Sequence, residues 1–123
     1  VSWQMKRFFE HASGLWFQQA WKDKIAAGFT NSGGASGDKL HALQSIQVNA
    51  GQHSMIWVSA GVMPSVYTKD GKDLNRLSSF SGLMTQAGNE APEVTPPKQD
   101  KDTAEAFGAR VAQATVRWVK GKG

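Results

Sequence analysis

The stretch that most constrains the fold is Ile25–Gly37, with the sequence IAAGFTNSGGASG. A short apolar run ends at Phe29, and small and polar residues follow it. Residues 38–50 then carry apolar side chains at helical spacing, and MIWVSA over 55–60 has the composition of a second buried strand. A strand, a helix and a strand in this order predict two adjacent parallel strands joined by a right-handed crossover. The sequence therefore predicts an α/β fold with a parallel sheet.

Three helices are expected around these strands. Residues 2–12 form the first, with Ser2 as its N-cap and Gly14 as a left-handed cap after its end. Its apolar face consists of Met5, Phe8, Phe9 and Ala12. The second, over 38–50, ends near Gly51 and should turn four side chains inward, namely Leu40, Leu43, Ile46 and Ala50. Thr103 should cap a final helix of about 17 residues, whose core face consists of Ala104, Phe107, Val111, Ala114 and Trp118.

Residues 61–100 are expected to form a long irregular connection between the second strand and the last helix. The connection contains Pro64, a turn at 69–72 and the proline-rich segment EAPEVTPPK at 90–98. Long connections in a compact domain are usually functional or interfacial.

The loop after Phe29 has two interpretations. Its glycines at 33, 34 and 37 allow positive φ angles and close approach of a ligand. Free N–H groups before the following helix would favour an anion or a polarised carbonyl. The loop lacks the Gly-Lys-Ser/Thr of a Walker loop and the spacing of GxGxxG. A plain connector is therefore the alternative.

Composition excludes several other classes of site. The 123 residues suffice for one domain, and the lack of cysteine rules out disulfides, thiolate ligands and a cysteine nucleophile. His11, His41 and His53 form no HxH or HExxH pair, so no metal site is predicted. No GxSxG motif supports a hydrolase triad. The apolar runs are short, so we expect no membrane insertion, and the absence of cysteine fits a cytoplasmic protein.

The net charge of +4 allows either a preference for anionic ligands or a mixed, solvated surface. The five tryptophans fit a core, an interface or a site for a flat ligand. A nucleic-acid binder would cluster its Lys and Arg with interleaved aromatic residues. The basic residues are instead scattered along the chain, so no nucleic-acid partner is expected.

Three motifs together resemble the flavodoxin-like NAD(P)H:quinone oxidoreductases, also called the tryptophan-repressor-binding-protein family, and the NADPH-dependent FMN reductases. They are SWQMKRFFEHASGLW at 2–16, AGFTNSGGASG at 27–37 and GQHSMIWV at 51–58. They follow one another in the family's order and spacing.

The resemblance implies a doubly wound, five-stranded parallel sheet with FMN at the carboxyl ends of its strands. The residues that match the family's flavin loop are Thr30, Asn31, Ser32, Gly33, Gly34, Ala35 and Ser36. Gln52 and His53 match a histidine pair near the flavin, with Gln52 replacing one histidine, and His53 is a possible catalytic residue. Trp16 matches an aromatic residue that closes the substrate space from a neighbouring subunit, which implies a dimer or tetramer.

In the family, the first strand, the phosphate-binding loop and the first flavin loop precede the matched motifs. We therefore expect residues 1–123 to be the C-terminal part of a single flavodoxin-like domain, with about two of its five strands. Two parallel strands alone leave a sheet edge without hydrogen-bond partners, so this part should not fold well by itself.

The activity that the resemblance implies is transfer of two electrons from NADPH or NADH, through FMN, to a quinone or a similar flat acceptor. A second hypothesis is a non-enzymatic, flavodoxin-type electron carrier or FMN-binding interaction module. The two differ in whether a substrate slot exists beside the flavin.

Overall fold

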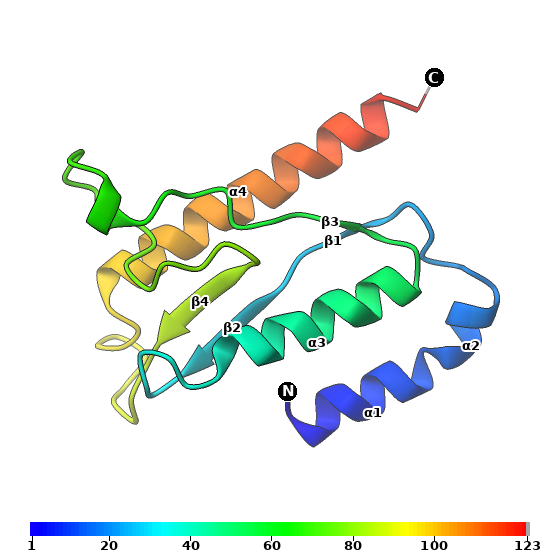
Figure 1. Cartoon of the computed structure of the whole chain (residues 1–123), viewed down its shortest axis with the longest axis horizontal. Helices are drawn as coiled ribbons and strands as arrows, with labels where there is room; N and C mark the ends of the chain where they lie inside the picture. The colour runs from blue at the N-terminus through cyan, green and yellow to red at the C-terminus, as the bar shows by residue number, and fades with distance from the viewer. Residues whose placement is uncertain (123) are drawn as a thin grey trace.

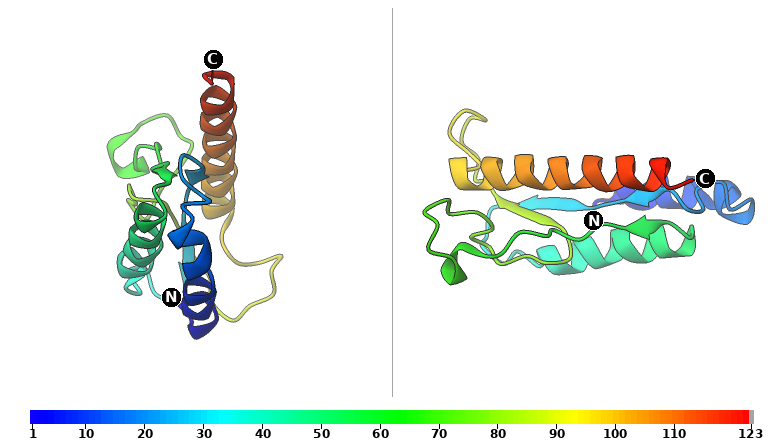
Figure 2. Two further views of the ribbon diagram at one scale, coloured as in Figure 1. Left: turned by 90° about the vertical axis from the view of Figure 1, so that its right-hand side faces the viewer. Right: turned by 90° about the horizontal axis from the view of Figure 1, so that it is seen from above.

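The computed structural model describes residues 1–122 and contains helices on both sides of short parallel strands. The elements are α1 (Trp3–His11), α2 (Ser13–Phe17), β1 (Ile25–Ala26), β2 (Phe29–Ser32), α3 (Lys39–Gln52), β3 (Ile56–Trp57), the 3₁₀ turn η1 (Ser65–Tyr67), β4 (Leu83–Gln86) and α4 (Lys98–Lys120). The strands lie between α3 on one side and α4 on the other (Figures 1 and 2). This layering confirms the predicted α/β class.

Both strand pairs are parallel. β1 pairs with β3, with Ile25 opposite Ile56, and β2 pairs with β4, with Phe29 opposite Leu83. The order β1, α3, β3 confirms the predicted strand–helix–strand unit. The strand expected over 25–30 is instead interrupted at residues 27–28, and it continues as β2 to Ser32.

Gly28 lies at this interruption, in a position without room for a side chain. A Cβ on Gly28 would lie 2.7 Å from the ring of Trp57, so only glycine fits there. The Gly28 carbonyl accepts from Leu83 N at 3.0 Å, and a Cβ on Gly82 would lie 2.5 Å from that carbonyl. Two glycines therefore let the chain pass from one strand partner to the next.

Strand β4 is the main element that the sequence did not reveal. It lies within the stretch 61–100, where only irregular structure was expected. Its four residues, Leu83–Gln86, are half polar, and three serines and one glycine lie among the five residues before them. Such a segment has no periodic signal, and its strand conformation depends on pairing with β2.

The core is small and centres on Leu43, which is completely buried on α3. The other buried apolar residues are Ala12, Ala50, Val58, Ala60, Leu83 and Phe107. Leu40 was expected to face inward but is 49% exposed, and Trp118 on α4 is 40% exposed. Lys39 takes the buried position at the start of α3 instead.

One helix end agrees with expectation and three differ. The agreement is at α1, which Ser2 caps because its Oγ accepts from Met5 N. Gly14, however, lies inside α2, and Gly51 lies inside α3. Helix α4 begins at Lys98, so Thr103 is an internal, buried residue whose hydroxyl accepts from Asn75 N and donates to Gln99 O.

The apolar face of α1 is largely uncovered. Met5 is 39% exposed and Phe8 is 53% exposed, although the Phe8 ring stacks on Trp21 at 6.2 Å. An apolar hollow of about 440 Å³ separates these side chains from β1 and α3. Within the described residues, β1 and β2 each pair along one edge, and the other edge has no strand partner.

The exposure difference between Leu43 and Leu40 gives a stability prediction. Leu43→Ala should lower the free energy of unfolding by about 3 kcal/mol, because it leaves a cavity between α3 and the strands. Leu40→Ala on the same helix should cost less than about 1 kcal/mol, because half of that side chain is already in water. Urea unfolding of both variants checks this; equal losses would contradict the assignment of the core.

Candidate functional site

The predicted loop lies where β2 ends and α3 begins. Thr30, Asn31 and Ser32 belong to β2 itself, so the loop starts at Gly33, later than expected. The Asn31 Oδ1 accepts from Thr85 Oγ1 at 2.8 Å across the strand pair. Because β2 and β4 are parallel and in register to Ser32 opposite Gln86, both strands end at this loop.

Side chains of the protein hold two of the loop carbonyls. Gln86 Nε2 donates to Gly33 O at 2.9 Å. Gly34 O accepts from Ser32 Oγ at 3.1 Å and from Lys39 Nζ at 2.7 Å. The N–H groups of residues 33–37, by contrast, have no acceptor within the part of the chain that the structure describes. The loop therefore offers free amide donors to a ligand.

Glycine has different roles at the two ends of this loop. Gly37 has a φ of +52°, and a Cβ there would overlap Ser32 Oγ, so the turn into α3 requires glycine. Cβ atoms on Gly33 and Gly34 would meet only backbone atoms, at 3.7 Å or more. The bare backbone at these two positions therefore has open space beside it.

Lys39 is a functional candidate that sequence reasoning missed. Its side chain is 1% exposed, in the first turn of α3. Loss of solvation lowers the pKa of Lys39, and the negative charge of Asp100 partly opposes this shift. The available signal was its position four residues before Leu43, which places both side chains on the inner face of the helix.

A second group of charged residues supports the loop from the side of β4. Arg76 donates to both carboxylate oxygens of Asp100, at 2.6 and 3.0 Å. Asp100, which is 2% exposed, also accepts from Gln86 N at 2.7 Å. Arg76 further donates to Gln86 Oε1, whose amide nitrogen holds Gly33. These bonds connect the 61–100 segment, β4 and α4 to the loop.

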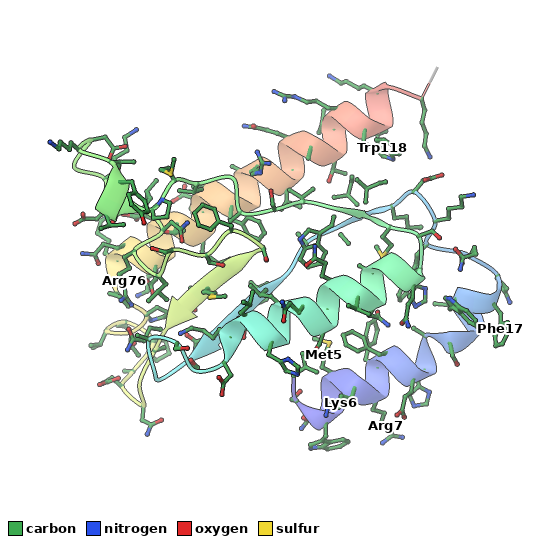
Figure 3. The ribbon with its side chains drawn as sticks, in the orientation of Figure 1. Met5, Lys6, Arg7, Phe17, Arg76 and Trp118 are labelled. Carbon is green, nitrogen blue, oxygen red and sulfur yellow. The ribbon has the colours of Figure 1, made fainter. Side chains whose placement is uncertain are left out.

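Two hollows flank the loop, and Arg76 lines both. One, of about 630 Å³, lies between Ala35, Ser36 and the 77–81 segment. The other, of about 590 Å³, lies between Gly33, Gln86 and the start of α4. Figure 3 shows Arg76 at the end of the molecule toward which β2 and β4 run. Open space thus exists where a ligand could contact the free amide groups.

The other predicted site residues lie elsewhere. Trp16, Gln52 and His53 line a hollow of about 230 Å³ beside the C-terminal end of α3. The loop adjoins the N-terminal end of this 14-residue helix, so about 21 Å of helix separates the two groups. The structure therefore divides the predicted site into two groups and does not unite them in one chain.

His53 is buried in this second group. It is 2% exposed, its ring centroid lies 4.5 Å from that of Trp21, and its Nδ1 has no hydrogen-bond partner among residues 1–122. A buried imidazole nitrogen without a partner costs free energy, and its burial within this chain keeps other molecules from reaching it.

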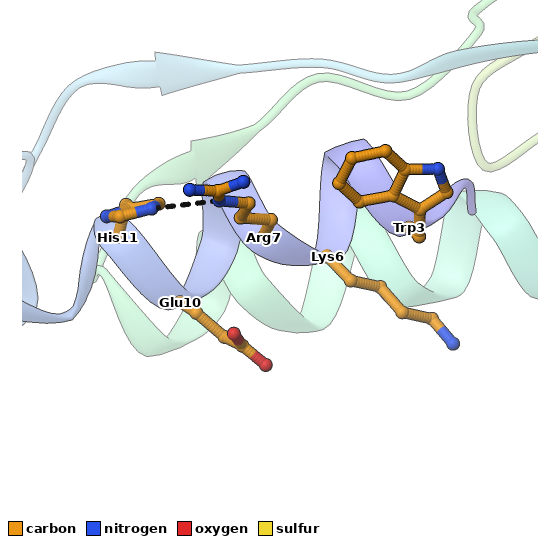
Figure 4. Close-up of a pocket in the computed structure, with 5 residues that line it drawn as sticks. All are labelled: Trp3, Lys6, Arg7, Glu10 and His11. Atoms are coloured by element: carbon orange, nitrogen blue, oxygen red, sulfur yellow. Dashed lines mark hydrogen bonds between the residues drawn. The ribbon is translucent and has the colours of Figure 1, made fainter.

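The hollow on α1 has a different character. It is lined by Trp3, Lys6, Arg7, Glu10 and His11, all from one helix (Figure 4). Arg7 Nε donates to His11 Nε2 at 3.3 Å, and all five residues are exposed. Without a buried polar group, this surface is not a built site.

The described residues contain no group of three or more His, Cys, Asp or Glu side chains that could hold a metal ion. Among the helices in this part of the chain, none has the length and apolar character needed to cross a membrane.

The chain is similar to known proteins over most of its length. It is 37% identical to flavodoxin FldP of Pseudomonas aeruginosa (strain UCBPP-PA14) over 114 residues, which are 92% of this chain and 62% of that protein. It superposes with a TM-score of 0.67 and 35% identity on the crystal structure of the flavodoxin, WrbA-like protein from Agrobacterium tumefaciens, covering 94% of this chain and 58% of the other. No family model matches the chain.

These similarities establish the fold. The chain has a flavodoxin-like α/β fold, as the sequence predicted, and it spans about three fifths of the length of both relatives.

Substitutions of Asp100 and Asp102 test whether the ion pair of Arg76 and Asp100 supports the loop. Asp100→Asn should lower the free energy of unfolding by about 3 kcal/mol, because it leaves the Arg76 guanidinium without its buried partner. Asp102→Asn should cost at most about 1 kcal/mol, because its pair with Lys98 is exposed. Urea unfolding measures both; a loss for Asp100→Asn no larger than that for Asp102→Asn would contradict a supporting role.

Proposed function

We propose that this chain belongs to an FMN-dependent oxidoreductase that passes two electrons from NADPH or NADH to a quinone or a similar flat acceptor. The observation that carries the proposal is the loop of free amide donors at the carboxyl ends of β2 and β4. Ligands of open α/β sheets bind at this edge. Both relatives are described as flavodoxins, which supports a flavin as the ligand.

The residues of the loop fit a flavin ring. Gly33 and Gly34 present backbone without a side chain, so a flat ring can approach closely. The N–H groups of residues 33–36 can donate to the ring's carbonyl oxygens, and such donors stabilise negative charge that develops on reduction. Bound FMN would supply the redox chemistry, while the protein positions it and sets its electrostatic environment.

Trp16, Gln52 and His53 have a role in this proposal as residues of a neighbouring copy. Their distance from the loop of their own chain prevents direct contact with a ring held there. Trp16 is 41% exposed and so is available to a second subunit. In a homo-oligomer, Trp16 would close the acceptor space of the next copy, with Gln52 and the buried His53 beside it.

An electron carrier without a substrate is the second candidate function. The relatives named flavodoxins favour it as much as the enzyme. Oxidation of NADPH in the presence of benzoquinone distinguishes the two, because a carrier does not catalyse it.

The first test is flavin binding. Gly34→Val should raise the Kd for FMN at least about tenfold, since 1.4 kcal/mol of crowding corresponds to that factor. The fold should tolerate the change, because a Cβ at Gly34 meets no atom closer than 3.7 Å. Gly108→Val on α4, where a Cβ meets nothing within 4 Å, is the matched control. An unchanged Kd for Gly34→Val, or no flavin absorbance with the parent protein, would contradict the assignment.

The second test concerns the neighbouring copy. Trp16→Ala should raise the KM for benzoquinone several-fold and leave the Kd for FMN unchanged, because Trp16 closes the acceptor space. Phe17→Ala is the control, since Phe17 is 79% exposed and follows directly in sequence. Light scattering should report a dimer or tetramer; a monomer with full activity would rule out the shared site.

A further inference from the structure

Lys39 poses a problem that stability does not explain. A buried ammonium loses its hydration, and it normally needs a carboxylate partner. The described residues place no carboxylate within 4 Å of Lys39 Nζ, which instead donates to Gly34 O at 2.7 Å. An apolar side chain at this position would avoid the cost of desolvation. The charge is therefore better explained by what it does to the loop.

The surroundings compensate the charge of Lys39 only in part. Asp100 is the acidic group whose charge acts on Lys39, and both of its oxygens already accept from Arg76. The opposite charges of Arg76 and Asp100 largely cancel at the distance of the loop. The three charges together thus leave about one positive charge near Gly34.

The contact geometry gives the lysine a second effect. Nζ and Ser32 Oγ both bind the Gly34 carbonyl, and Gln86 binds the Gly33 carbonyl. With these oxygens bound to the protein, the dipoles of the loop present their N–H ends to a ligand.

We propose that Lys39 is a positioning residue that holds the Gly34 carbonyl and whose charge makes the loop bind reduced flavin more tightly than oxidised flavin. This inference rests on the proposed function. Hydride transfer from reduced nicotinamide to bound FMN would carry two electrons and one proton, so the nicotinamide would be oxidised and the flavin ring would gain one negative charge. A fixed positive charge behind the loop favours the ring after that transfer.

The experiment compares the affinity of each variant for the two redox states. FMN is titrated into the protein as oxidised flavin and, under dithionite, as reduced flavin. Lys39→Met should raise the Kd for reduced flavin about tenfold more than the Kd for oxidised flavin. For a two-electron couple this ratio equals a reduction potential about 30 mV more negative. Lys39→Arg, which keeps the charge, should keep the ratio within about twofold of the parent.

The controls separate charge from structure. Lys6→Met removes an exposed lysine on α1 and should leave both Kd values unchanged (Figure 3). Lys39→Gln keeps a hydrogen-bond donor but loses the charge, so it should change the ratio of the two Kd values as Lys39→Met does. If circular dichroism shows that Lys39→Met is unfolded, Lys39→Gln takes its place. Without flavin, amide exchange at residues 34–36 should be faster in Lys39→Met.

The outcomes distinguish the two proposals. If the parent protein binds neither form of FMN, the proposed function fails and the inference fails with it. If the parent binds FMN but the ratio is unchanged in Lys39→Met and Lys39→Gln, only the inference is overturned. Equal weakening of both redox states would likewise reject the role of the charge and leave Lys39 a structural residue.

Discussion

The parallel pairing of β2 with β4 is the contact on which the candidate site depends. It sets Ser32 opposite Gln86, so both strands end at the same loop and Gln86 can hold Gly33. The pairing requires close backbone approach, which Gly28 and Gly82 permit because neither position has room for a Cβ. A strand of four residues has little stability of its own, so β4 exists because this approach is sterically possible.

Charge is distributed unevenly beneath the loop. The bidentate pair of Arg76 and Asp100 joins the 61–100 segment to α4 and is self-compensating. Lys39 has no such partner among the described residues, and its hydrogen bond goes to the loop itself. A paired charge mainly fixes geometry, whereas an unpaired charge also sets the local potential. The same few residues therefore give the loop both its shape and its electrostatic character.

The predictions from sequence succeeded where local periodicity was strong. The first helix with its Ser2 cap, the β1–α3–β3 unit and the buried position of Leu43 all followed from spacing and capping rules. They failed where tertiary contacts decide, as for β4 and for Thr103, which lies inside α4. The loop lies between a strand and a helix as predicted, although it begins at Gly33 and not at Thr30. Lys39, Arg76 and Asp100 belong to segments far apart in sequence, and no local pattern predicts that they lie near one another.

The sequence by itself determined the α/β class, the order of the central elements and the glycine-rich loop between strand and helix. These depend on periodicity and backbone freedom, which are properties of neighbouring residues. The tertiary structure decided that the loop carbonyls are held by Gln86 and Lys39, and that Trp16 and His53 lie at the other end of α3. Those facts depend on distances through space, because strand pairing and the length of a helix determine which side chains meet.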